Sequence, residues 1–266
     1  ILENPCKKWK GEMTGLRRNQ VIREKSFFEG KFIDWVSKDG SRRNEYSGIL
    51  HEMELFYSQL RPLSRFNEYY NECFLGTEII SFIQNNIHPL EALIANDSLP
   101  EDSVRSAASK LLKGIPGFFK NYDAETDEKI SAVMLKLFRD STDSKFIPSI
   151  YSDISSKYAD HFDRYVRDVF KKSIFTDQAR LTKFLLTLSH HSLKKFRKDP
   201  AIILYASFSK VMNTLVREDL ARYNNRIASL QARYMKAQME MTLDPLYPDA
   251  NLTLRCAYGQ VSGYRP

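Results

Sequence analysis

The chain has 266 residues, of which 42% are hydrophobic and 27% are charged, values typical of a water-soluble globular protein with a substantial core. It contains no apolar run of roughly 18 residues, which excludes a membrane-spanning helix. The formal net charge of +7 permits an acidic partner, but the basic residues are spread along the chain, unlike the clustered charge of a nucleic-acid-binding arm.

Apolar residues recur at helical spacing through the first third of the chain. The spacing predicts one helix over residues 5–36, ended by turn residues at 39–41, and a second helix over 44–60. We expect Pro62 to interrupt that helix and a third helix to run from about residue 66 to 83. Short turns between aromatic-rich helices indicate antiparallel packing.

The middle of the chain continues this pattern. Pro100 and the acidic residues after it predict a helix that lasts to about Leu112, where the glycines and proline of 114–117 are expected to break it. Residues 117–130 are expected to form a linker into a helix whose apolar positions lie at 130–138. Three shorter helices are then expected, over 147–158, 160–172 and 177–196.

The last predicted helix is the longest. Asp199 is expected to be its N-cap and Pro200 its first residue, and the apolar periodicity continues to about Leu243. A helix of about 44 residues, at about 1.5 Å per residue, is a rod of roughly 65 Å.

Residues 248–264 have a different pattern. Leu252, Leu254 and Cys256 alternate with other residues, and glycines follow, which is typical of a β-strand. A lone strand cannot pair its own backbone groups, so its partner strands are expected outside this chain. The sequence therefore predicts a piece of a larger protein, with a helical domain over 1–244 and a linker and strand over 245–266.

The sequence contains parts of metal-binding motifs, but none of these motifs is complete. His51 and Glu52 begin like a zinc-protease helix, but Leu55 stands where the second histidine is needed. Neighbouring histidines at 190 and 191 point to different sides of a helix and cannot chelate one metal together. The three cysteines, Cys6, Cys73 and Cys256, are too widely separated for a metal pattern or a disulfide framework. Cys73 is expected in the core.

Nucleophile patterns are equally incomplete. Ser192 with Lys195, and Ser207 with Lys210, match Ser-x-x-Lys, but the companion motifs are missing, so both pairs are interpreted as coincidences. The chain has no phosphate-binding glycine loop and no Gly-x-Ser-x-Gly. By itself it is not expected to be a complete enzyme, and no cofactor is expected.

Five blocks of the sequence together resemble the bacterial dipeptidyl-peptidases seven and eleven, which are exported serine exopeptidases. The last block is the most specific of them. The blocks are NxxKKWKGE at 4–12, NECFLGTEI at 71–79, GFFKNYDAETDEKI at 117–130, QARYMKAQMEM at 231–241 and PDANLTLRCAYGQVSGY at 248–264.

The resemblance implies a fold and a role. In that family a chymotrypsin-like double β-barrel holds the Ser-His-Asp triad, and an inserted helical domain covers the active-site cleft. This chain then corresponds to the insertion, an all-α, bundle-like domain with a very long C-terminal helix, and to its short exit strand into the barrel. The family's catalytic histidine and aspartate precede this region and its Gly-Asn-Ser-Gly motif follows it, so no catalytic residue is expected here.

The resemblance also implies partners and a location. The partners are a peptide substrate with a free N-terminus and the β-barrel peptidase domain of the same parent chain. The location is the periplasm, the cell surface or the medium into which the enzyme is secreted. A homodimer of the parent enzyme is compatible with it, whereas nucleic acid and metal are not implied.

One binding residue is carried over from the family. Asn4 matches, by its place before the KKWKGE run, an asparagine that helps to bind the α-amino group of the substrate. A side-chain carbonyl is a good acceptor for an ammonium group. Asn4 followed by Pro5 is also a good N-cap for the first helix, and the two roles are compatible.

An alternative from another class stays open at this point. The chain could be a stand-alone basic helical protein that binds an acidic partner or nucleic acid. Its net charge is the only feature that favours this hypothesis.

Overall fold

The computed structural model describes residues 3–95, 100–189, 192, 195–242 and 259–263. Every regular element in these residues is helical, which confirms the all-α prediction for this part of the chain. The residues of the predicted strand at 252–256 lie outside the described ranges, and 259–263 form no strand, so the β segment has no structural support. The predicted boundary at residue 244 also lies outside them and stays a prediction.

The chain divides into two compact units. Unit 1 consists of Ile1–Met53 and Ala228–Pro266, and unit 2 is the continuous segment Glu54–Ile227. Two long helices, α4 (Ile49–Tyr69) and α13 (Arg217–Met241), contribute residues to both units.

Unit 1 begins with three helices, namely α1 (Glu3–Arg18), α2 (Val21–Ser37) and α3 (Gly40–Tyr46). The prediction of a single helix over 5–36 is wrong, because the backbone of Gln20 turns into the left-handed region at φ 50°. That conformation ends the ladder of one helix before the next begins. The turn expected at 39–41 is also a helix start, since the Asp39 side chain accepts a hydrogen bond from Arg42 N at 2.9 Å.

The core of unit 1 is small and joins distant parts of the sequence. Phe32 of α2 meets Tyr234 of α13 edge to face at 5.0 Å between ring centroids. The hydroxyl of Tyr46 donates to Glu240 Oε1 at 2.9 Å, across 194 positions of sequence. The buried apolar side chains are Phe32, Val36, Tyr46, Ile49, Tyr234 and Ala237.

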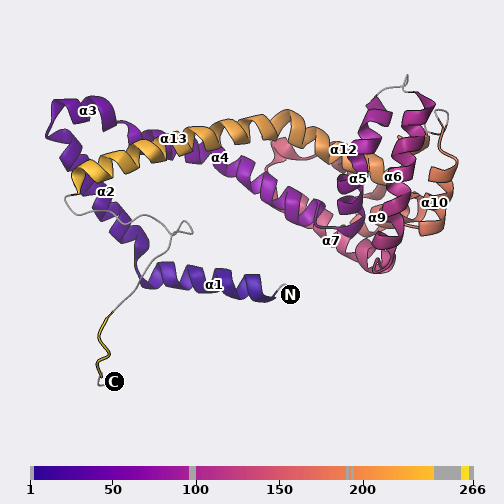
Figure 1. Cartoon of the computed structure of the whole chain (residues 1–266), viewed down its shortest axis with the longest axis horizontal. Coiled ribbons are helices and arrows are strands. Elements are labelled where there is room, and N and C mark those ends of the chain that lie inside the picture. Colours follow the sequence, from indigo (N-terminus) through magenta and orange to yellow (C-terminus); the bar gives the residue numbers. More distant parts are fainter. Residues whose placement is uncertain (1–2, 96–99, 190–191, 193–194, 243–258, 264–266) are drawn as a thin grey trace. The chain divides into compact units, whose positions relative to one another are not determined.

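Unit 2 holds the larger core, around which most of its helices gather (Figure 1). Its described residues include two five-residue π-helical turns, η1 (Tyr70–Phe74) after α4 and η3 (Met212–Val216) before α13. The other elements are α5 (Glu78–Ala95), α6 (Glu101–Phe119), α7 (Ala124–Ser141), η2 (Ser144–Phe146), α8 (Ile150–Tyr158), α9 (Phe162–Lys172), α10 (Gln178–Leu186) and α12 (Pro200–Val211).

Two expected breaks at proline are wrong. Pro62 lies inside α4 and Pro116 lies inside α6. A proline removes one backbone hydrogen bond, but neighbouring turns can hold the helix when their side chains are buried. Leu63 and Phe66 after the first proline and Ile115 before the second are all buried, which supplies that anchoring.

Other boundaries differ by part of an element. The expected linker at 117–130 shrinks to four residues, since Asp123 accepts from Thr126 N at 2.7 Å and starts α7 at Ala124. The helix expected over 177–196 ends at Leu186.

The longest predicted helix is confirmed as a helical run of 42 residues, from Pro200 to Met241, in which the π-turn η3 joins α12 to α13. Its predicted start is also correct, because the Asp199 carboxylate accepts from Ala201 N at 2.9 Å and Pro200 is the first helical residue.

An aromatic cluster occupies the centre of unit 2. Phe208 of α12 stacks on Phe74 of η1 at 3.8 Å between centroids and 6° between planes. Its ring also meets Phe138 of α7 at 4.8 Å in a T-shaped pair. Phe208 is fully buried, so one side chain joins three elements.

Replacing this ring tests the role of the cluster. We expect Phe208→Ala to lower the free energy of unfolding by about 3–5 kcal/mol, because it leaves a cavity between three helices. The measurement is urea unfolding of both proteins. The control Leu186→Ala removes an exposed side chain and should stay within about 0.5 kcal/mol. Equal losses for both variants would contradict the central role of Phe208.

Candidate functional site

The candidate site is a polar groove of about 650 Å³ in unit 2. Both π-turns line it, η1 with Tyr70 and Asn71 and η3 with Met212 and Asn213. Its other lining residues come from α4, the η1–α5 connection, α5, α12 and α13, and they are Asn67, Leu75, Gln84, Tyr205, Ser209, Arg217, Leu220, Ala221 and Asn224.

The floor of the groove is already hydrogen-bonded. Tyr205 donates its hydroxyl proton to Gln84 Oε1 at 2.6 Å, and the hydroxyls of Tyr70 and Ser209 lie 3.5 Å apart. Burial raises the pKa of the Tyr70 phenol above its ordinary value. These hydrogen-bonded groups line the groove together with the exposed amides.

The π-turns explain how the groove arises. A π-turn inserts an extra residue into a helix, which widens it locally and redirects the side chains that follow, and such turns are frequent at functional sites. After η1 the chain turns sharply, and a Cβ at Gly76 would clash with the carbonyl oxygen of Glu72. Glycine is therefore required at this position for the chain to enter α5.

The buried carboxylate of Asp127 has a structural role in the same unit. It accepts hydrogen bonds from Glu78 N at 2.9 Å and Ile79 N at 3.0 Å, and so binds the first turn of α5 from α7. The Tyr122 hydroxyl approaches the same carboxylate at 3.5 Å. Burial is the strongest influence on this group and raises its pKa, against the lowering effect of the N–H donors.

Asp199 makes a second buried contact of this kind. Besides capping α12, it accepts from Ser173 Oγ at 2.9 Å and from Ile174 N at 2.8 Å, just after α9. Burial raises its pKa as well. Both aspartates are fully engaged with backbone and hydroxyl donors, so they are structural groups rather than free acids or bases.

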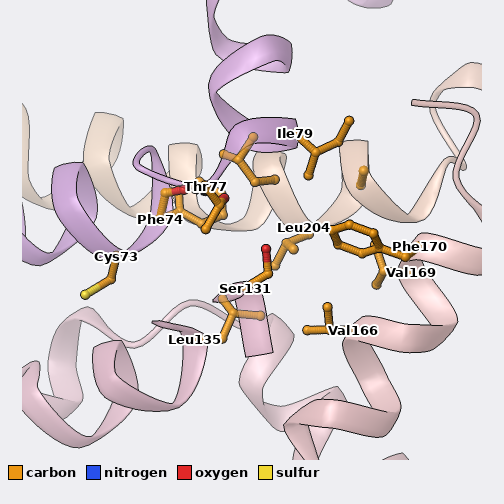
Figure 2. Close-up of a pocket in the computed structure, with 12 residues that line it drawn as sticks. Cys73, Phe74, Thr77, Ile79, Ser131, Leu135, Val166, Val169, Phe170 and Leu204 are labelled. Carbon is orange, nitrogen blue, oxygen red and sulfur yellow. Dashed lines mark hydrogen bonds between the residues drawn. The ribbon is translucent and has the colours of Figure 1, made fainter. Parts of the chain in front are cut away.

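A second cavity, enclosed in the core, is not a ligand site (Figure 2). Its volume of about 10 Å³ has room for about one water molecule, and its lining is almost wholly apolar. Figure 2 shows Ser131 among Leu135, Val166 and Leu204, and the Ser131 hydroxyl has no hydrogen-bond partner among the described residues.

The serines and cysteines that the sequence singles out do not form a catalytic set among the described residues. Ser207 Oγ accepts from Ile150 N at 3.1 Å and supports the start of α8, which explains it structurally. Ser192 exchanges hydrogen bonds with the backbone of Ser189. Cys73 is buried in the core, as predicted, and Cys6 is exposed. His190, His191 and Cys256 lie outside the described residues.

No group of three or more metal-binding side chains exists in the part of the chain that the structure describes. Within the same part, no helix has the length and apolar character needed to cross a membrane.

The structure places Asn4 inside the first turn of α1, which already includes Glu3, so the prediction that Asn4 is the N-cap of this helix is wrong. The side chain of Asn4 lies outside the described residues. The amine-binding role of Asn4 therefore stays a prediction.

The groove itself was missed by the sequence analysis. A usable signal was present, since Asn67 and Asn71 are four residues apart, as are Asn213 and Arg217. Residues at that spacing share a helix face. A polar face on a helix whose other face is aromatic indicates a polar surface.

The comparisons with known proteins cover the whole chain. A model of the family described as Peptidase S46 matches residues 1–266. The Asp/Glu-specific dipeptidyl-peptidase of Flavobacterium psychrophilum is 29% identical over 265 residues, which are 99% of this chain and 36% of that protein. Dipeptidyl-peptidase 7 of Phocaeicola vulgatus is 25% identical over 250 residues, 93% of this chain and 34% of that protein.

A solved structure supports the fold. The crystal structure of Porphyromonas endodontalis DPP11 in complex with the dipeptide Arg-Glu matches with a TM-score of 0.68 at 20% identity, over 90% of this chain and 33% of that chain. The chain therefore spans about a third of the length of the relatives that it matches.

The pKa of Asp127 gives a testable pH dependence. A raised pKa means that the folded state holds this proton more tightly than the unfolded state, so the stabilisation is complete below pH 3.8 and is lost as the pH rises through the folded value. We expect the stability advantage of the wild-type chain over Asp127→Asn to shrink as the pH rises from below 3.8 towards neutrality. Urea unfolding at a series of pH values measures it. An advantage that grows with pH would show that the N–H donors outweigh burial.

Proposed function

Because the chain belongs to the peptidase S46 family, we propose that it is the helical domain of a dipeptidyl-peptidase that removes dipeptides from the N-termini of peptides. The family match over residues 1–266 carries the proposal, together with relatives named as dipeptidyl-peptidases. It favours this function over a stand-alone basic binding protein, which rests on net charge alone.

In this proposal the domain covers the active-site cleft, and the chemistry belongs to the rest of a longer parent enzyme. The proposal is supported by the lengths of the relatives, since this chain spans only about a third of each. The described residues present engaged aspartates and backbone-bonded serines rather than a nucleophile with its base. The triad is accordingly assigned to a β-barrel domain of the same parent chain, and the parent enzyme to an exported location.

The surface of α1 supports a covering role. Trp9, Met13 and Leu16 follow one another at intervals of four and three residues, so they share one face of the helix. They are 58%, 51% and 56% exposed. A stripe of large apolar side chains left in water is unfavourable and marks a surface for contact with another part of a protein. In the proposed parent enzyme, the peptidase domain would supply that contact.

Asn4 opens the same helix, one turn before Trp9. We assign it to the substrate's α-amino group, since a carboxamide oxygen accepts from an ammonium without adding charge. The positive end of a helix dipole would oppose a cation at this position. The parent enzyme must therefore supply a further acceptor or a carboxylate beside Asn4.

The Asn4 assignment is tested by kinetics of the parent enzyme. We expect Asn4→Ala to raise KM and to lower kcat/KM about tenfold for dipeptide substrates with a free N-terminus, because one hydrogen bond to a charged group is lost. The control is Asn44→Ala, which removes an exposed carboxamide of α3 and should leave both constants unchanged. Wild-type kinetics in the Asn4 variant would remove the amine-binding role.

A further inference from the structure

The groove of unit 2 presents side-chain amides that the fold does not use. The side chains of Asn67, Asn71, Asn213 and Asn224 form no hydrogen bond with any residue that the structure describes. Three of these four are exposed, and Asn67 is half-buried. Unlike the structural aspartates, these groups are free to bind a ligand.

A carboxamide offers two N–H donors and an acceptor oxygen, which match the C=O and N–H groups of a peptide main chain. A row of such groups binds a backbone whatever its side chains are. The volume of about 650 Å³ falls within the range of ordinary ligand sites, about 300–1,000 Å³, and suits a few residues of extended peptide.

Arg217 adds direction to the groove. It is the only charged residue in the described lining, and its guanidinium forms no ion pair with any described residue. Arg222, five residues further along α13, differs in this respect, because it pairs with Asp219 at 2.7 Å and lies over the Tyr223 ring. An unpaired guanidinium beside amides is a site for a carboxylate, which it can bind with two parallel hydrogen bonds.

We propose that this groove binds the main chain of a peptide and holds its free C-terminal carboxylate at Arg217. The inference rests on the proposed function and extends it, since it assigns the part of a peptide substrate beyond the first two residues to a site in the helical domain. It makes short peptides with an unblocked C-terminus the preferred substrate class.

The test uses the full-length parent enzyme and two synthetic probes. One is an N-acetylated tetra-alanine with a free C-terminal carboxylate, and the other is the same peptide with a C-terminal amide. The acetyl group removes the ammonium that Asn4 is proposed to bind. Isothermal titration calorimetry measures the affinity of each probe for the wild-type enzyme and for the variants Arg217→Gln and Arg222→Gln.

We expect the free acid to bind about tenfold more tightly than the amide, as one charge-assisted contact provides. Arg217→Gln should abolish this difference, whereas Arg222→Gln should preserve it. The double variant Asn71→Leu with Asn213→Leu should weaken both probes alike, because it removes main-chain contacts. Equal binding of acid and amide to the wild-type enzyme, or a difference that persists in Arg217→Gln, would overturn the proposal. Circular dichroism checks that each variant is folded.

The result is separable from the test of the proposed function. Asn4→Ala should leave the affinity for both acetylated probes unchanged while it impairs cleavage of unblocked peptides. If Arg217→Gln has no effect while Asn4→Ala impairs cleavage, the groove proposal fails and the proposed function stands.

Discussion

A helix that begins inside a protein core leaves backbone N–H groups where water cannot reach them, and these groups must find other acceptors. In unit 2 two aspartates provide them. Asp127 reaches from α7 to the first turn of α5, and Asp199 joins the start of α12 to the residue that follows α9. Each carboxylate thus fixes the position of one helix against another. The aromatic stack of Phe74, which precedes α5, with Phe208 of α12 lies in the same unit.

The groove depends on the same arrangement. Asp127 sets the start of α5, which carries Gln84, and Asp199 sets the start of α12, which carries Tyr205. The two π-turns then direct amides away from the aromatic core and into the groove. A polar surface can exist directly beside a dense apolar core because the polar floor is paired internally while the rim faces water.

The features that follow from local chemistry were predictable from the sequence. Asp199 with Pro200 marks a helix start within two residues, and periodicity gave the long C-terminal helix. The contacts of Asp127 were not predictable, because its partners lie 48 and 49 positions away. The helix break predicted at Pro62 was wrong, because burial of neighbouring residues stabilises α4 by more than the one lost hydrogen bond costs. The resemblance identified the family, but the π-turns that line the groove have no sequence signature. Only the polar residues at four-residue spacing, Asn67 with Asn71 and Asn213 with Arg217, pointed to a polar surface.

The composition of unit 1 from both ends of the chain has a consequence for the order of folding. Unit 2 is continuous, so all of its contacts become available once the chain has emerged from the ribosome as far as residue 227. The core of unit 1 needs Tyr234 and Ala237 against Phe32 and Tyr46, across almost two hundred positions. Contacts of such separation form late and slowly. The apolar side chains of α2 therefore stay exposed to solvent until the segment that contains Tyr234 and Ala237 has been synthesised. During this interval they form an apolar surface that a chaperone can bind.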